Sequence, residues 1–162
     1  MRWLRQYTEA GRLPASLLMS FALLLAGCGS EIPSSEVTTG LTLDCAVFQT
    51  NVNPIFDQDI GGRTCSASGC HNVSGSAGGA FKIYPNAAIS SIQMQANYLA
   101  AKGFSNLSSP VDSKLLLEPL TGSQSIVGSH AGGDIFDTGD VEYMTILSWI
   151  ATQIQGPSSC IP

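Results

Sequence analysis

Cys65-Ser66-Ala67-Ser68-Gly69-Cys70-His71 is the stretch from which the fold and chemistry of this chain can be worked out. An imidazole directly follows the second of two nearby thiols. The residues between the thiols are small, and Gly and Ser permit the tight turns that bring two cysteines together. These residues alone leave three interpretations open: a Cys65–Cys70 disulfide beside an exposed His71, a zinc site that includes the chain's other Cys and His residues, and a site for a covalently bound cofactor.

The same seven residues resemble a haem c attachment site. In such sites two thiols add across the haem vinyl groups as thioethers, and the adjacent imidazole becomes the proximal iron ligand. The usual motif has two residues between the cysteines, whereas this chain has the longer variant with four. The resemblance implies that Cys65 and Cys70 bind the haem and that His71 binds its iron.

Four further segments extend the resemblance. They are Val52-Asn53-Pro54-Ile55-Phe56 and, downstream, Ser113-Lys114-Leu115-Leu116-Leu117-Glu118-Pro119-Leu120, His130-Ala131-Gly132-Gly133 and Tyr143 to Trp149-Ile150. Their order, over about residues 45–152, resembles a family of small cytochrome c-like domains in exported bacterial proteins. This implies a mostly α fold: a small cytochrome c-like helical domain with long loops around one covalently bound haem c. Ala131 departs from the family, which has Gly after the His.

His130 is the expected second axial ligand of the iron. In small cytochromes c this ligand usually lies on a loop shortly before the last helix, which is where His130 stands. The neighbouring glycines would let the backbone approach the porphyrin closely. We therefore expect a bis-His haem, with Met94, Met144 or an open position as the alternatives.

The two methionines fall in expected helices, where apolar spacing suggests which side chains are buried. Met144 belongs to a stripe at helical spacing and is expected in the core. Met94 lies off the stripe of its own helix. The two stripes are Val141, Met144, Leu147, Ile150 and Ile154, and Ile89, Ile92, Ala96 and Leu99.

The residue pattern predicts helices over about 45–55, 86–101 and 112–117, and a final helix from 138 or 140 to 153. Asp44 is expected to cap the first helix, and Asp140 the last. Between these helices, Ala80–Tyr84 is expected to be extended, and 118–139 is expected to be a long loop carrying His130.

Residues 1–27 have the pattern of a signal peptide: basic residues, then an apolar stretch too short to span a bilayer. Leu25-Ala26-Gly27-Cys28 resembles the lipobox of bacterial lipoproteins, which implies a lipid on Cys28. Residues 28–40 then form a flexible tether and 41–162 the cytochrome c-like domain. Gly29 instead of Asp weakly favours the outer membrane.

Cys45 and Cys160 flank the expected domain. Because the first and last helices cross in small cytochromes, the resemblance implies that a Cys45–Cys160 disulfide would join them. Export favours this bridge over the alternative of two free thiols.

The chain is acidic, with net charge −5, and 12% of its residues are charged. Loss of residues 1–27 would make the net charge −7. Nucleic acid is therefore not an expected partner, since its phosphates require a basic surface. The acidic residues Asp134, Asp137, Asp140 and Glu142 have no recognisable calcium-loop spacing and are expected to form a solvated rim that could steer a basic redox partner.

Together these features predict an electron carrier, not an enzyme: a lipid-anchored monohaem c-type cytochrome on the periplasmic face of the cell envelope, serving a redox partner protein. Two alternatives remain open. One is a haem-free structural or partner-binding lipoprotein held by disulfides. The other is a haem enzyme or gas sensor with an open iron position.

Overall fold

The computed structural model describes residues 40–121, 130–156 and 159–161. The expected signal peptide (residues 1–27) lies outside these residues, as do Cys28 and nearly all of the expected tether. The chain divides into two units, Met1–Glu36 and Val37–Pro162, and every described residue belongs to the second.

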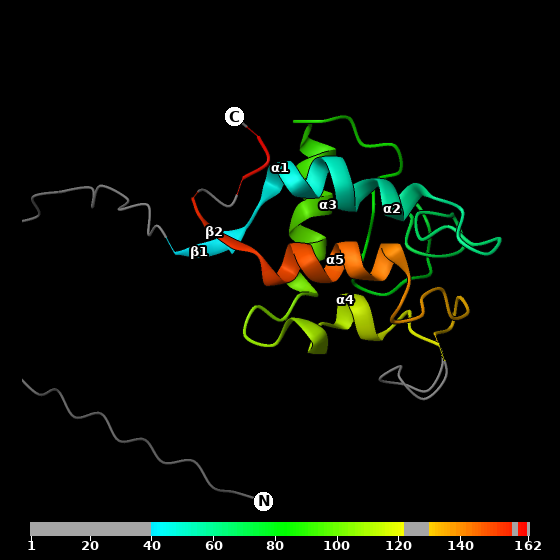
Figure 1. The fold of residues 1–162 in the computed structure, drawn as a ribbon. Helices are drawn as coiled ribbons and strands as arrows, with labels where there is room; N and C mark the ends of the chain where they lie inside the picture. The colour runs from blue at the N-terminus through cyan, green and yellow to red at the C-terminus, as the bar shows by residue number, and fades with distance from the viewer. Residues whose placement is uncertain (1–39, 122–129, 157–158, 162) are drawn as a thin grey trace, which may run out of the picture. The chain divides into compact units, whose positions relative to one another are not determined.

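One continuous helical rod opens the domain and leads to the Cys65–His71 stretch (Figure 1). It consists of α1 (Cys45–Val47), a π-helical turn η1 (Phe48–Val52) and α2 (Asn53–Asp57). The Asp44 carboxylate accepts hydrogen bonds from the amides of Ala46 (2.8 Å) and Val47 (3.2 Å), so the expected N-cap is confirmed. Pro54 lies in the first turn of α2, directly after the π-helical turn.

The second long helix begins later than the sequence suggests. Helix α3 spans Ile92–Gly103, and the Ser91 hydroxyl caps it by accepting from the Met94 amide at 3.0 Å. The predicted start near residue 86 is wrong because Asn86 and Ser90 have φ angles of 52° and 59°, which a right-handed helix does not allow.

The remaining elements are short apart from the last helix. They are η2 (Pro110–Asp112, a 3₁₀ turn), α4 (Lys114–Leu117), α5 (Val141–Ala151) and the strands β1 (Leu41–Leu43) and β2 (Gln153–Gln155). The strands pair antiparallel, with Leu41 opposite Gln155, a small sheet that the sequence analysis did not predict. Helices therefore predominate over strands in a fold that is mixed. None of the helices described is long and apolar enough to cross a membrane.

Helix α5 packs against the opening rod and runs in the opposite direction in Figure 1. The ring centroids of Phe48 and Trp149 are 5.2 Å apart, and the Trp149 indole donates to the Asp44 carbonyl at 2.8 Å. Asp140 stands at the N-cap of α5, but its carboxylate accepts from the Asp137 amide instead of from the helix. The first and last helices thus share one aromatic core.

The buried faces of α3 and α5 differ from the expected stripes. On α3, Met94 is buried (1% exposed) whereas Ile92 is 76% exposed. On α5, Ile150 is buried as expected, but Met144 is 50% exposed, so its predicted core position is wrong. Tyr98 and Trp149 occupy core positions on these two helices, and part of each expected aliphatic stripe faces solvent.

Cys45 and Cys160 form a disulfide in the structure, with Cα atoms 5.3 Å apart and a sequence separation of 115 residues. The Gln49 amide donates to the Cys160 carbonyl at 3.3 Å. The disulfide joins the start of the first helix to the C-terminal segment of the chain.

The two helical methionines give a matched test of these helix orientations. Met94→Ala should lower the free energy of unfolding by about 2–5 kcal/mol because it leaves a cavity in the core. Met144→Ala should change it by no more than about 0.5–1 kcal/mol. Urea denaturation of both variants measures the difference, and equal effects would contradict the placement of the two faces.

The disulfide can be tested by mass. The mature protein should take up no alkylating reagent at Cys45 and Cys160 until it is reduced, and then one group at each. Replacing both cysteines with Ala should lower the free energy of unfolding by up to about 4.7 kcal/mol in the chain-entropy model. Alkylation of both residues without reductant would show that the bridge does not form.

Candidate functional site

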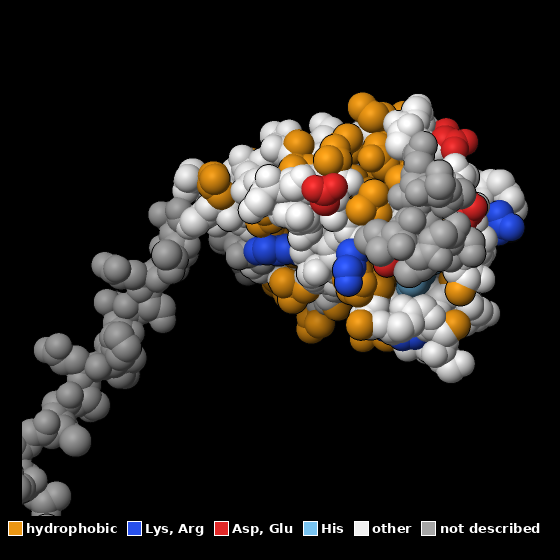
Figure 2. All heavy atoms as spheres, turned by 90° about the horizontal axis from the view of Figure 1, so that it is seen from below, with side chains coloured by type: hydrophobic (Ala, Val, Ile, Leu, Met, Phe, Trp, Pro, Cys, Tyr) orange, Lys and Arg blue, Asp and Glu red, His pale blue; other side chains and the backbone are white. Residues whose placement is uncertain are grey.

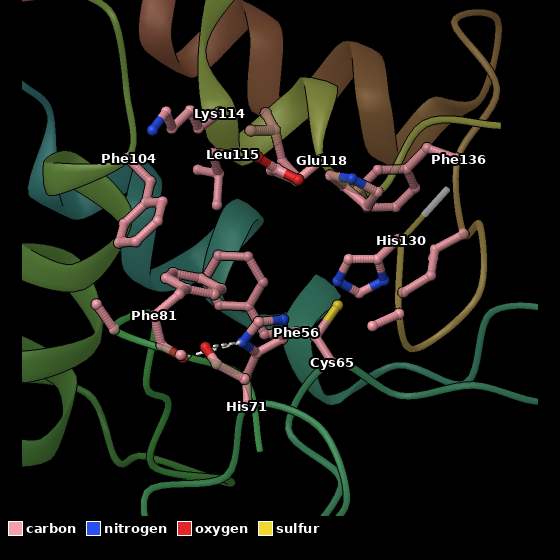
Figure 3. A pocket seen from close by; sticks show the side chains of 17 residues that line it. Phe56, Cys65, His71, Phe81, Phe104, Lys114, Leu115, Glu118, His130 and Phe136 are labelled. Carbon is pink, nitrogen blue, oxygen red and sulfur yellow. Dashed lines mark hydrogen bonds between the residues drawn. The ribbon is translucent and has the colours of Figure 1, made fainter. Parts of the chain in front are cut away.

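A cavity of about 430 Å³ lies among the segment that follows α2, helix α4 and the His130 loop (Figure 3). Such a volume is typical of a cofactor or small-molecule site. Most of the lining is apolar or aromatic: Phe56, Phe81, Phe104, Leu115, Ile135, Phe136 and Ile146, together with Ala80, Ala131 and Pro119. The polar side chains that line it are Cys65, His71, Lys114, Glu118 and His130.

The Cys65–His71 stretch folds into a closed loop at this cavity. The His71 amide donates to the Cys65 carbonyl and the Cys70 amide to the Ala67 carbonyl, each at 2.9 Å. The Ser66 amide also donates to the Phe56 carbonyl at 2.9 Å, which ties the loop to the end of α2. The turn therefore brings both cysteines and His71 together.

Cys65 and Cys70 are both thiols and do not pair with each other. Cys65 is buried and lines the cavity, whereas Cys70 is half-buried beside the His130 loop. Burial raises the pKa of Cys65 to about 11, and the charge of Cys70 adds to this effect. Cys65 is therefore a neutral thiol at physiological pH.

The His71 ring is oriented by two backbone carbonyls. Its Nδ1 lies 2.9 Å from the Phe81 oxygen and 3.1 Å from the Gly78 oxygen. Both oxygens are acceptors, so Nδ1 carries the proton and Nε2 keeps its lone pair, as in most metal-ligating histidines. Burial lowers the pKa of His71 and favours this neutral form.

Gly78 is required for the close approach to His71. Its φ angle is +82°, and a Cβ atom there would overlap the Cys70 carbonyl oxygen and would lie 2.7 Å from His71 Nδ1 and 2.9 Å from His71 Cα. No role for Gly78 was predicted from the sequence. The signal that could have indicated one is the pair Gly78-Gly79, shortly before Phe81.

Asn97 fixes the segment that carries the Phe81 carbonyl. From the buried face of α3, its side-chain amide donates to the Tyr84 carbonyl (2.9 Å) and to Asn53 Oδ1 (2.8 Å) and accepts from the Tyr84 amide (2.8 Å). Ile83 continues the segment by donating from its amide to the His71 carbonyl at 2.7 Å. Of the stretch Ala80–Tyr84 that was expected to be extended, Ile83 alone pairs, in an isolated β-bridge with Asn72, and Ala80 lies in a turn. Asn97 was not identified from the sequence.

His130 comes to the same cavity from a different loop, as Figure 3 shows. The ring centroids of His71 and His130 are 5.7 Å apart, with an angle of 21° between the planes. His130 Nδ1 lies 3.0 Å from the Gly133 carbonyl oxygen, so here too Nε2 is left as the basic nitrogen. The structure therefore brings together the two histidines that the sequence singled out, although they stand far apart in the chain.

Two further contacts hold the His130 loop. The Arg63 guanidinium packs against the backbone of Gly133 (φ +89°) and donates to the Asp134 carbonyl at 3.2 Å. At Gly132 a Cβ atom would lie 3.2 Å from the His130 ring and 3.8 Å from Cys70 Sγ, so this glycine is a close-contact position. Arg63, which the sequence analysis did not assign to the site, therefore joins the His130 loop to the cysteine loop.

The acidic residues serve as local hydrogen-bond acceptors. Asp134 accepts from the His130 amide at 3.3 Å, Asp137 from the Thr121 hydroxyl at 2.5 Å and Glu142 from the Gln58 side chain at 2.8 Å. The prediction that these acidic residues form a solvated rim did not include these hydrogen bonds.

The alternative ligands are not at the cavity. Met94 lies in the core, and Met144 lines a separate cavity of about 410 Å³ between α1–η1 and α5. Over the part of the chain that is described, no three His, Cys, Asp or Glu side chains are grouped so that they could hold a metal ion.

Paired alanine substitutions test the close packing of Gly78 against Cys70 and His71. Gly79 also has a positive φ angle, but a Cβ there would meet nothing within 4 Å. Gly79→Ala should therefore destabilise the domain by about 1 kcal/mol through backbone strain alone. Gly78→Ala should cost a further ~2 kcal/mol because the new methyl group overlaps the Cys70 carbonyl oxygen and the His71 imidazole. Denaturation curves measure both, and equal losses would contradict the tight contact.

No protein-family model, curated protein or solved structure matches this chain. Its function must therefore be inferred from the residues and geometry of the site: a closed loop with two thiols, and two oriented imidazoles at an apolar cavity.

Proposed function

We propose that this domain binds one haem c and works as an electron-transfer protein. The observation that carries the proposal is the meeting of His71 and His130 at an apolar cavity that Cys65 also lines. A chain with only two histidines has brought both to one cavity, from loops that are far apart in sequence.

The residues present fit a haem. A porphyrin is a flat, largely apolar macrocycle, and the rings of Phe56, Phe81, Phe104 and Phe136 provide apolar lining for it. Because residue 132 is a glycine, no side chain of this residue fills the space beside the His130 ring.

In this proposal Cys65 and Cys70 hold the macrocycle through thioether bonds, and His71 and His130 bind the iron. When bound, the haem supplies an iron that cycles between the ferric and ferrous states by outer-sphere electron transfer. The protein orients both imidazoles through hydrogen bonds in which Nδ1–H donates to a backbone carbonyl. These hydrogen bonds increase the basicity of Nε2.

The spacing of the imidazoles supports bis-His ligation. Two nitrogens that bind one metal atom would lie within about 4 Å of each other, because each bond is roughly 2 Å long. Ring centroids at 5.7 Å allow such a separation. Two imidazoles stabilise ferric iron better than an imidazole and a thioether do, so the potential should lie below that of Met/His cytochromes.

The proposal extends to the N-terminal residues that the sequence analysis assigned. We infer export through residues 1–27 and a lipid on Cys28, with residues 28–40 as a tether on the periplasmic face of the cell envelope. Several acyl chains on one residue would anchor the protein more firmly than one chain does.

A spectrum and a mass provide the test. The full chain, expressed with a c-type maturation system, should be red, give a pyridine haemochrome spectrum and gain the mass of one haem. Cys65→Ala with Cys70→Ala should abolish covalent attachment, because no thiol remains to form a thioether. Colourless wild-type protein without the added mass would refute the proposal and favour a haem-free lipoprotein.

Carbon monoxide tests the second axial ligand. The reduced wild-type protein should not bind it, whereas His130→Ala should bind it because one iron position is freed. Met144→Ala is the matched control and should behave like the wild type. Binding by the wild type would instead indicate an open position, and a methionine-to-iron charge-transfer band would show methionine ligation.

A further inference from the structure

Lys82 connects the two segments whose carbonyl groups accept from His71. It stands between Phe81, whose carbonyl accepts from His71, and Ile83, which pairs with the His71 carbonyl. Its ammonium group reaches back over the preceding loop, donating to the Gly75 carbonyl at 2.8 Å and also to the Ala77 carbonyl.

The loop that Lys82 holds supplies the other acceptor of the His71 proton. Gly78 follows Ala77 directly, and its carbonyl oxygen lies 3.1 Å from His71 Nδ1. An ammonium group has three donors, so it can bind two neighbouring carbonyls at once. Fixing the carbonyls of Gly75 and Ala77 therefore restricts the position of the Gly78 carbonyl.

We propose that Lys82 is a positioning residue for the proximal imidazole. Its ammonium group closes the 72–79 loop so that the Gly78 carbonyl meets His71 Nδ1–H and the ring points Nε2 into the cavity. This inference rests on the proposed function and deepens it, because it names a side chain that fixes the orientation of an iron ligand without touching the iron.

The backbone of this loop would not by itself hold the Gly78 carbonyl in one position. Residues 72–79 contain three glycines, two serines and one alanine, whose small side chains provide little packing. The loop's own backbone bond, from the Gly75 amide to the Asn72 carbonyl at 2.9 Å, closes only its first half. Lys82 reaches the second half, next to Gly78.

Electron paramagnetic resonance of the ferric, haem-loaded protein tests this role. The low-spin signal depends on the orientation of the axial imidazoles. Lys82→Met should shift and broaden the signal, because the His71 ring would occupy several orientations. Lys82→Arg should restore a narrow signal, since a guanidinium also donates to carbonyls.

Lys102→Met is the matched control. Lys102 is also half-buried, but its ammonium donates to the Thr42 hydroxyl at 3.1 Å and lies over the Tyr98 ring, and it does not line the cavity. This variant should keep the wild-type signal. A changed potential with an unchanged signal in Lys82→Met would overturn the positioning role and indicate a purely electrostatic effect of the lost charge.

A second measurement does not require haem. In protein with ¹⁵N-labelled histidine, the Nδ1–H of His71 should exchange with water about fivefold faster in Lys82→Met than in the wild type, the change expected for weakening one neutral hydrogen bond. Equal exchange rates would refute the positioning role. If the wild type proves to be haem-free, the proposed function fails, while this comparison still decides the role of Lys82.

Discussion

The hydrogen bonds from His71 Nδ1 to two backbone carbonyls are the constraint on which the site depends. One acceptor, at Phe81, belongs to the segment Phe81–Tyr84, which Asn97 fixes from α3. The other, at Gly78, belongs to a loop that needs a glycine where it touches the ring. A ring held in this way cannot rotate without breaking both bonds, so the basic nitrogen keeps one direction. The helical core therefore acts on the chemistry indirectly, by placing two carbonyl groups.

The cavity is built from loops on a small aromatic framework. Phe48, Tyr98 and Trp149 pack together where α3 and α5 meet the opening rod, and Phe56 continues this packing to the cavity wall. Functional side chains often lie on loops that a rigid scaffold holds in position. Here the scaffold is small for the length of loop that it carries, which explains why single side chains such as Arg63 and Lys82 fasten whole segments.

Sequence reasoning succeeded where the signal is local. Asp44 caps the first helix because a carboxylate directly before a helical run accepts hydrogen bonds from the free amides of the first turn. It failed where three-dimensional packing decides. The stripe of Ile92 and Leu99 is periodic, yet Tyr98 and Met94 are buried in its place, because periodicity shows which residues share a face but not which face is covered. The contacts of Gly78 and Arg63 join segments distant in sequence or depend on backbone angles that composition does not reveal.

The disulfide has a mechanical consequence. Every residue that lines the cavity lies between Cys45 and Cys160 in the chain, so the site is enclosed in a covalent ring. Strand β1, which precedes Cys45, is paired with β2, which precedes Cys160. A force applied to the chain before Leu41 would therefore act first on the β1–β2 strand pair and then on the Cys45–Cys160 disulfide. These two connections would resist the force before it reached the loops that carry the two imidazoles.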